Sequence, residues 1–232
     1  MNVFKYINDT FKDTPDLVER KIKYSFSCVH IYYIETICSS EQINNFVLKN
    51  LTNPNGPRRF KDILAGPNFK EIDLGRLEFY LYNGFTALVY KGKIYVIETK
   101  ASLDRSVSFP EMEQDLYGAK DALLENYQKN IGLIKRRLKS SHLKTKEYKL
   151  GRFTQTATGV LYVDNITDMS LVKRIDALLN KIDTDSVIDV GELKQFLTMD
   201  KGNVFPPTKL TERPDVIVKA LLDGKVVIVM DT

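Results

Sequence analysis

The stretch RSVSFPEMEQDLYGAKDALLENYQKNIGLIKRRLKSS at residues 105–141 decides the fold that the sequence predicts. Its start carries a capping box, in which Ser108 accepts from the first turn, Glu111 follows three residues later, and Pro110 stands where no N–H is needed. Acidic side chains crowd the first turns and basic side chains the last, which suits the two poles of a helix dipole. Apolar residues between them recur at steps of three and four and form one stripe: Leu124, Tyr127, Ile131, Ile134 and Leu138. The stretch therefore predicts a long helix that joins the parts on either side.

Two glycines interrupt this helix. Each interior glycine costs about 1 kcal/mol relative to alanine. We expect a break at Gly118, which makes this residue a hinge candidate, and close helix packing at Gly132.

The chain before this stretch predicts helices and strands in alternation. A short helix capped by Thr14 is expected over residues 14–22, and the apolar run SFSCVHIYYIE at 25–35 predicts a buried central strand. Further helices are expected over 41–51, 58–65 and 74–82, the last two closed by Gly66 and Gly84. The run FTALVYKGKIYVIETK at 85–100 predicts a hairpin that turns at Lys91 and Gly92.

The chain after this stretch predicts a similar order. Residues 150–163 have strand character, with Gly151 and Gly159 as bulge or turn points. An amphipathic helix follows a cap at Thr167 or Asp168, and a shorter one covers 191–198. A last helix over 214–222 ends near Gly224 and leads into a buried strand over 226–230.

The two halves share the order of apolar strand, helix, shorter helices, helix ending at glycine, and apolar strand. VHIYYIET at 29–36 resembles TGVLYVDN at 158–165, and LEFYLYNGFTALVY at 77–90 resembles VIVKALLDGKVVIVM at 216–230. We therefore expect an α/β fold of two small α/β subdomains with mixed sheets, a diverged repeat, joined by a long or broken helix. The predicted limits are 1–104 for the first subdomain, 105–142 for the connecting helical segment, which is able to pack with the first subdomain, and 143–232 for the second.

Composition bounds the class of protein. The 232 residues carry a net charge of +4, too small by itself to indicate nucleic-acid binding. Two cysteines, Cys28 and Cys38, with no signal peptide predict reduced, structural thiols in an intracellular compartment. No window approaches the roughly 20 apolar residues that a membrane span needs, so we expect this chain to be soluble.

Few patterns point to catalysis. Glu98-Thr99-Lys100 at a strand end has the E-x-K spacing of some metal-dependent nucleases, but a strand end is commonly polar, and only Asp73 precedes it as a further ligand. His30 and His142 lack neighbours that would complete a metal site. No nucleotide-binding or acyl-transfer motif occurs, so neither cofactor nor metal is expected.

Two charged segments remain. The basic run KRRLKSSHLKTK at 135–146, with His142 in a loop, suits phosphates of nucleic acid or of an anionic membrane, yet lacks aromatic residues for base stacking. TERPD at 211–215 predicts a helix cap with a local ion pair.

The chain resembles the A subunits of the spore germinant receptors of bacilli and clostridia, the GerA family. TERPD looks identical to one family signature, and LLDGKVVIVMD at 221–231 is similar to the segment that leads into the family's membrane region. The other signature is carried by Arg105-Ser-Val-Ser, Pro110, Glu113, Gly118, Glu125, Asn130, Leu133, Ile134, Arg136, Arg137 and Lys139. The chain departs from it at Phe109, where the family has Glu, and at Tyr117 and Ala119, where it has Arg and Pro.

The resemblance implies a non-enzymatic hydrophilic portion of a larger subunit with transmembrane helices beyond it. It implies assembly with B and C subunits, or a homo-oligomer through the A subunit, in the spore inner membrane. There nutrient germinants trigger ion release, and a ligand-gated ion channel is one proposed role of the A subunit. Nucleic acid is not an expected partner. Residues expected at subunit or subdomain contacts are Arg105, Glu113, Asn130, Arg136, Arg137, Glu212, Arg213 and Asp215.

Two other functions stay open at this point. One is a small-molecule module that binds the germinant between the two subdomains. The other is a metal-dependent nuclease that uses Glu98 and Lys100.

Overall fold

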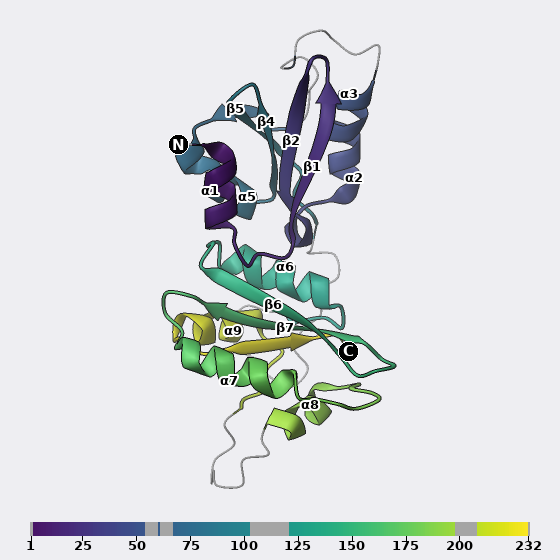
Figure 1. The fold of residues 1–232 in the computed structure, drawn as a ribbon, viewed down its shortest axis with the longest axis vertical. Helices are drawn as coiled ribbons and strands as arrows, with labels where there is room; N and C mark the ends of the chain where they lie inside the picture. Colours follow the sequence, from purple (N-terminus) through teal and green to yellow (C-terminus); the bar gives the residue numbers. More distant parts are fainter. Residues whose placement is uncertain (1, 54–59, 61–66, 103–120, 198–207, 232) are drawn as a thin grey trace. The chain divides into compact units, whose positions relative to one another are not determined.

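The computed structural model describes residues 2–53, 60, 67–102, 121–197 and 208–231 (Figure 1). The chain forms two compact units, the first of residues 1–103 with 139–141 and the second of residues 104–138 with 142–232. Helices and strands alternate in both units, which confirms the mixed α/β class. The division at residues 104 and 142 stays a prediction, since most of the predicted connecting segment lies outside the described residues.

The first unit contains a five-stranded sheet. Its order is β1-β2-β4-β5-β3, with β1 at Leu17–Tyr24, β2 at Ser27–Ile34, β4 at Phe85–Tyr90, β5 at Lys93–Glu98 and β3 at Lys70–Ile72. The apolar run of β2 pairs on both sides, which confirms the predicted central strand. The predicted hairpin is also confirmed, because Lys91 and Gly92 both have positive φ, as tight turns between β-strands require.

Helices cover both faces of this sheet. In Figure 1, α2 and α3 lie on one side of it and α1 and α5 on the other. The bounds are α1 at Val3–Thr10, η1 at Glu35–Ile37, α2 at Ser40–Ile43, the π-helix η2 at Asn44–Leu48, α3 at Lys49–Thr52, η3 at Leu74–Arg76 and α5 at Leu77–Tyr82. The helices predicted over 41–51 and 74–82 are therefore confirmed, and the one over 58–65 lies almost entirely outside the described residues.

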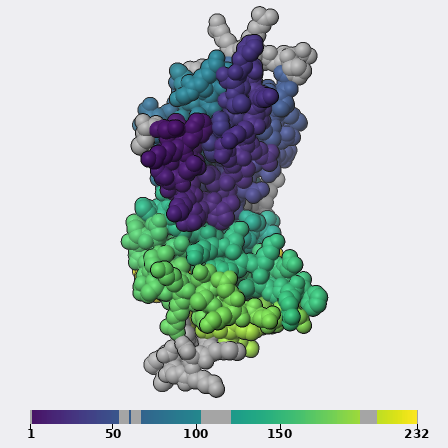
Figure 2. Space-filling model, viewed as in Figure 1, coloured from purple at the N-terminus to yellow at the C-terminus, as the bar shows by residue number. Residues whose placement is uncertain are grey.

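The helix predicted over residues 14–22 is wrong, because this segment is strand β1. The signals Thr14, Pro15 and Asp16 imitate a helix cap, but the Asp16 carboxylate accepts from Thr36 Oγ1 at 2.5 Å and its carbonyl oxygen accepts from Glu35 N at 2.9 Å. These bonds tie the start of β1 to the end of β2. The first helix lies earlier, at α1. The purple residues of α1, β1 and β2 make up much of the face of this unit that Figure 2 shows.

The second unit contains a three-stranded sheet of order β6-β7-β8. Its strands are β6 at Leu143–Leu150, β7 at Thr156–Val163 and β8 at Val227–Met230. Helices α6 at Tyr127–Arg137 and α9 at Pro214–Leu222 share one apolar core with it. Helices α7 at Met169–Leu179 and α8 at Val190–Leu197 share another. The helices expected after Asp168, over 191–198 and over 214–222 are thus confirmed.

Two expectations for the second unit are wrong, and one strand was not predicted. Residues 143–150 form β6, whereas the sequence predicted strand character only from residue 150 onward. Gly159 lies inside β7 with a regular partner on each side, so it is neither a bulge nor a turn, whereas Gly151 does turn, at φ +81°. The described strand pairs of both units are all antiparallel, where mixed sheets were expected.

The predicted connecting helix is shorter than expected within the described residues. It begins at Tyr127, because the Asn126 side chain accepts from Lys129 N, and residues 121–126 are not helical. Gly132 is buried inside α6. The predicted start at Ser108 and the predicted break at Gly118 lie outside the described residues.

Candidate functional site

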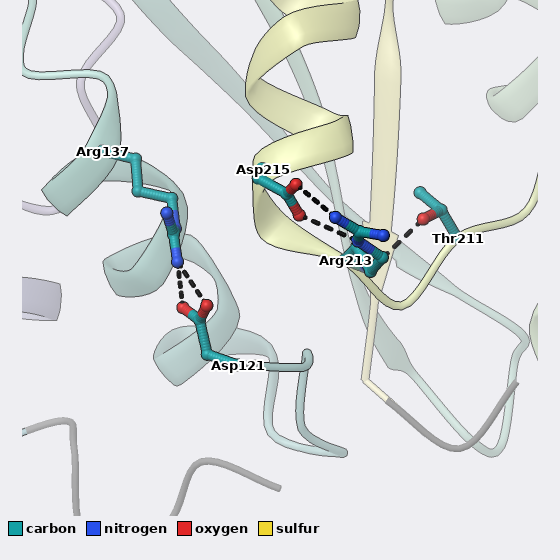
Figure 3. A network of polar contacts seen from close by, with 5 residues as sticks. All are labelled: Asp121, Arg137, Thr211, Arg213 and Asp215. Atoms are coloured by element: carbon teal, nitrogen blue, oxygen red, sulfur yellow. Dashed lines mark hydrogen bonds and ion pairs between the residues drawn. The ribbon is translucent and has the colours of Figure 1, made fainter. Parts of the chain in front are cut away.

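Two stretches that lie far apart in the sequence meet in the second unit. The N–H of Leu123 donates to the carbonyl oxygen of Glu212 at 2.7 Å, and α6 packs against α9. Figure 3 shows the two charged groups nearby, Asp121 with Arg137 and Arg213 with Asp215. The two segments that the resemblance singled out therefore form one site, which we call the α6–α9 site and which comprises residues 121–137 and 211–215.

Asn130 fixes the chain that leads into α6. Its side chain is buried, with 2% exposed. The Oδ1 atom accepts from Leu124 N at 2.7 Å, and Nδ2 donates to Leu124 O at 2.5 Å. One amide side chain thus satisfies both backbone groups of a non-helical residue, which would otherwise lie half-buried without partners.

The last turn of α6 closes onto the same segment. The Arg137 guanidinium makes a close ion pair with both carboxylate oxygens of Asp121 (Figure 3). Arg136 beside it is half-buried. The basic end of α6 therefore binds the residue that stands six positions before the start of this helix.

The TERPD segment begins α9. Arg213 Nε and Nη2 donate to the two Asp215 carboxylate oxygens at 3.1 and 2.7 Å, and Arg213 N donates to Thr211 Oγ1 at 3.2 Å. Pro214 occupies the first helical position, as predicted. The Arg213 guanidinium, helped by backbone N–H groups at the helix start, holds the pKa of Asp215 below its usual value. The predicted local ion pair is confirmed.

The sequence did not predict the contacts that Tyr127 makes in this site. The N–H of Tyr127 donates to Asp231 Oδ1 at 2.7 Å, and the Tyr127 hydroxyl donates to Glu147 Oε1 at 3.2 Å. The ring lies against Gly159, where an added Cβ would be 2.4 Å from Tyr127 Oη. Only a glycine leaves room for it, a signal that is visible in the sequence as an unexplained glycine within a strand.

The remaining candidates are not placed. Arg105, Glu113 and Gly118 lie outside the described residues. Of the predicted contact residues, the structure brings together Asn130, Arg137, Glu212, Arg213 and Asp215. Asn130, Arg137, Arg213 and Asp215 form hydrogen bonds or ion pairs within the chain through their side chains. Glu212 does so through its carbonyl oxygen, so these contacts hold the backbone of the α6–α9 site in place.

Much of the predicted basic run at 135–146 is also compensated within the chain. Lys135 is fully buried. Lys139 Nζ donates to Asn83 Oδ1 at 2.7 Å in the first unit. In the second unit, Lys144 and Lys146 lie 3.8 and 3.6 Å from carboxylates of Asp164 and Asp176. These contacts reduce the charge that the run offers to an anionic partner.

The nuclease hypothesis gains no geometric support. Glu98 Oε2 accepts a hydrogen bond from Asn68 Nδ2, and the Lys100 stem lies against Gly84. Within the described ranges, no three His, Cys, Asp or Glu side chains are grouped so as to hold a metal ion. His30 is bound by Glu19 at 3.0 Å and His142 by Asp164 at 2.7 Å.

The two thiols differ from each other. Both cysteines are free. Cys38 is buried, and this burial raises its pKa to about 12. Cys28 is exposed, so the prediction of a packed structural thiol holds only for Cys38.

In the described part of the chain, no helix has the length and apolar character to cross a bilayer.

Comparison with known proteins identifies the family. The family model described as Bacillus/Clostridium GerA spore germination protein matches residues 5–232. Spore germination protein XA of Bacillus anthracis is 26% identical over 212 residues, which are 87% of this chain and 43% of that protein. Spore germination protein A1 of Bacillus subtilis (strain 168) is 27% identical over 244 residues, covering 98% of this chain and 50% of that protein. This chain thus spans about half the length of these relatives.

A solved structure has the same fold. The crystal structure of the N-terminal domain of the A subunit of the Bacillus megaterium spore germinant receptor GerK3 matches with a TM-score of 0.72 at 24% identity, covering 98% of this chain and 89% of that one. The family model, which spans nearly the whole sequence, confirms the resemblance: the chain belongs to the GerA family of spore germination proteins.

Proposed function

We propose that this chain is the N-terminal hydrophilic portion of a spore germinant receptor A subunit, and that it acts without catalysis in receptor assembly and germinant signal coupling. The observation that carries this proposal is that the TERPD signature and the described part of the other family signature meet in the α6–α9 site. Side chains that hold a non-helical segment in place have a structural purpose there, and the charged groups that border this segment are left near the surface.

The exposure of these charges suits a polar contact with another subunit. The side chains of Asp121 and Arg137 are 22% and 32% exposed, and that of Asp215 is 33% exposed. A rigid backbone with half-exposed charges at its border resembles the rim of a protein interface, where charges set orientation and partner choice. The partners in this proposal are the B and C subunits, or further copies of the A subunit, in the spore inner membrane.

Charge reversal at Arg136 in the full-length gene tests the contact. We expect Arg136→Glu spores to contain less assembled receptor in the inner membrane and to release ions more slowly on exposure to nutrients. Lys173→Glu, an exposed lysine on α7, is the matched control and should behave as wild type. Since Arg136 is half-buried, thermal unfolding of the purified chain must accompany the spore measurements, with Arg136→Gln in reserve if the reversal unfolds it. Normal receptor assembly and normal germination in a folded Arg136→Glu variant would overturn the contact role.

A further inference from the structure

A single phenylalanine stands fully exposed at the tip of the β1–β2 hairpin. Phe26 has a relative exposure of 105%, as in an extended peptide. It belongs to the two-residue turn between Tyr24 and Ser27, in which Ser25 has a φ of +54°. Such turns favour Gly, Asn or Asp, and Phe26 adds nothing to the core. Among the described residues of the first unit, the apolar ring therefore belongs to no hydrophobic core.

Lysines surround this tip. Lys23 is the second residue before the turn and pairs with Cys28, and Lys21 pairs with His30 on the same face of the sheet. Because β2 pairs with β4 with His30 opposite Val89, the β4–β5 turn at Lys91 lies at this same end. Lys91 lines an open depression there together with Cys28, His30 and Phe4. One end of the sheet thus combines an exposed ring with three lysines, of which Lys21 lies 3.6 Å from the exposed Glu19.

We propose that this end of the first unit, which we call the Phe26 tip and which comprises Lys21, Lys23, Phe26 and Lys91, binds the surface of an anionic phospholipid bilayer. The ring enters the boundary between head groups and acyl chains, and the lysines contact head-group phosphates. Aromatic insertion and a basic patch are each weak anchors, and together they give reversible binding. The lysine stems reach over apolar surface while their ammonium groups stay hydrated.

The second unit contains a natural control for this proposal. Its β6–β7 hairpin corresponds to β1–β2 and also has an exposed phenylalanine at its tip, Phe153, with 83% exposed. There, however, Arg152 Nε lies 3.0 and 3.7 Å from carboxylates of Asp185 and Asp183. Two acids beside one arginine remove the positive potential that an anionic surface requires, so the aromatic ring alone should not bind.

Single tryptophans test the insertion directly, because the chain has none of its own. Phe26→Trp and Phe153→Trp variants of the 232-residue chain are each mixed with vesicles of phosphatidylcholine, with or without phosphatidylglycerol. We expect a blue shift of tryptophan emission for Phe26→Trp with phosphatidylglycerol vesicles, and none for Phe153→Trp. An unshifted Phe26→Trp spectrum, or an equal shift with phosphatidylcholine alone or at position 153, would overturn the proposal.

Vesicle co-sedimentation separates the two contributions. Phe26→Ser should weaken binding by at least about tenfold. Each lysine is worth roughly fivefold, so Lys23→Glu with Lys91→Glu should weaken it by more than about 25-fold. Phe153→Ser should bind as wild type. Sedimentation that depends on protein concentration, needs no vesicles and disappears in Phe26→Ser would instead assign the tip to contact between copies of this chain. This proposal does not depend on the receptor role, since vesicle binding is measured without other subunits.

Discussion

The two units share one arrangement of strands, an antiparallel hairpin with a third strand beside it, but form it from different residues. The hairpins β1–β2 and β6–β7 each contain eight directly opposed residue pairs, and Leu17 opposite Ile34 corresponds to Leu143 opposite Val163. In both units the same hydrogen bond closes the open end: Glu35 N donates to Asp16 O at 2.9 Å, and Asp164 N donates to His142 O at 3.0 Å. The correspondence extends to atoms that no side chain determines.

The third strand of this arrangement follows the same rule in both units. Gly84 and Gly224 end helices α5 and α9 with φ values of +82° and +79°. Three residues later, Ala87 and Val227 pair with the second strand of the hairpin, at Tyr32 and Leu161. The sequence predicted similar stretches in the two halves, and the strand registers place these stretches at corresponding positions.

The units differ in the hydrogen bonds that fix the start of the helix preceding the hairpin. In the second unit, Asp231 binds the start of α6, Gly159 makes room for Tyr127, and Asn130 ties down the preceding segment. In the first unit, α1 has its cap at Asn2 and an open depression beside Phe4. In the second unit, side chains from other segments therefore hold the start of α6. In the first unit, one edge of α1 borders an open depression. The α6–α9 site is the set of contacts that makes this difference.

The largest predicted effect comes from removing the Asn130 side chain, the central contact of the second unit's α6–α9 site. Asn130→Ala leaves the N–H and carbonyl group of Leu124 without their partner, and each lost partner costs about 1–3 kcal/mol, so we expect a loss of roughly 3 kcal/mol in the free energy of unfolding. Urea unfolding measures it, and hydrogen exchange at Leu124 N–H should accelerate by about 10².

Asn50→Ala in the first unit is the matched control. Asn50 Nδ2 donates to Phe46 O at 2.9 Å within the helical segment of residues 40–52, and Asn50 is less buried than Asn130. Its expected cost is below about 1 kcal/mol. Equal losses in the two variants would mean that α6 is held no more firmly than the first unit's helices.

The second prediction concerns the space beside Gly159 in β7, which the Tyr127 ring occupies. Gly159→Val places methyl groups where the Tyr127 ring lies. Tyr127 is held by hydrogen bonds from both its backbone N–H and its hydroxyl, so the ring has little room to move away. We expect a loss of about 2 kcal/mol by urea unfolding, typical of an overpacked core. In a Tyr127→Ala background the same change should cost much less. Gly75→Ala, with no atom within 4 Å of the added Cβ, should cost nothing.

The comparison also explains which parts of the fold the sequence reveals. Apolar strands such as β2, β5 and β7 stand out as runs of buried residues, and the helices after Asp168 and Arg213 begin with ordinary start signals. Three strands were missed, and all three lie at a sheet edge: β3, together with β1 and β6, which occupy equivalent outer positions in their sheets. The sequences of β1 and β6, LVERKIKY and LKTKEYKL, contain the lysines and glutamates that protect a sheet edge from aggregation, and these residues hide the strand pattern.

The α6–α9 site was only half visible for a different reason. Asn130, Arg137 and Arg213 were singled out, but the partners of Asn130 are the backbone atoms of Leu124. Likewise the link between the two segments joins Leu123 N to Glu212 O. Every residue has these backbone groups, so no pattern of side chains specifies which of them meet.

The third prediction concerns acid. The pKa of Asp215 is lowered in the folded chain by Arg213, so the ion pair stabilises the folded state above the unfolded value of about 4 and loses this effect as pH falls through the lower, folded value. Solvent screens a carboxylate that is one third exposed, which limits the effect to about 1 kcal/mol. The stability difference between wild type and Asp215→Asn should therefore be constant near neutral pH and shrink below about pH 4. Arg213→Leu should lose the same acid dependence, and a difference that grew on acidification would contradict the assignment.

The smallest predicted effect tests whether surface charges help to hold α6 in the second unit. A double-mutant cycle of Asp121→Asn and Arg137→Gln should give a coupling of about 0.5 kcal/mol, because both side chains are partly exposed and the pair is screened. The pair Glu71 and Lys93 joins β3 to β5 in the first unit at 2.7 Å and is more exposed, so its cycle should give a smaller coupling. Added salt should reduce both values. A vanishing Asp121–Arg137 coupling, together with a large stability loss in Asn130→Ala, would mean that the buried Asn130 amide holds α6 without help from the ion pair. The charges of α6 would then be available for contacts outside the chain.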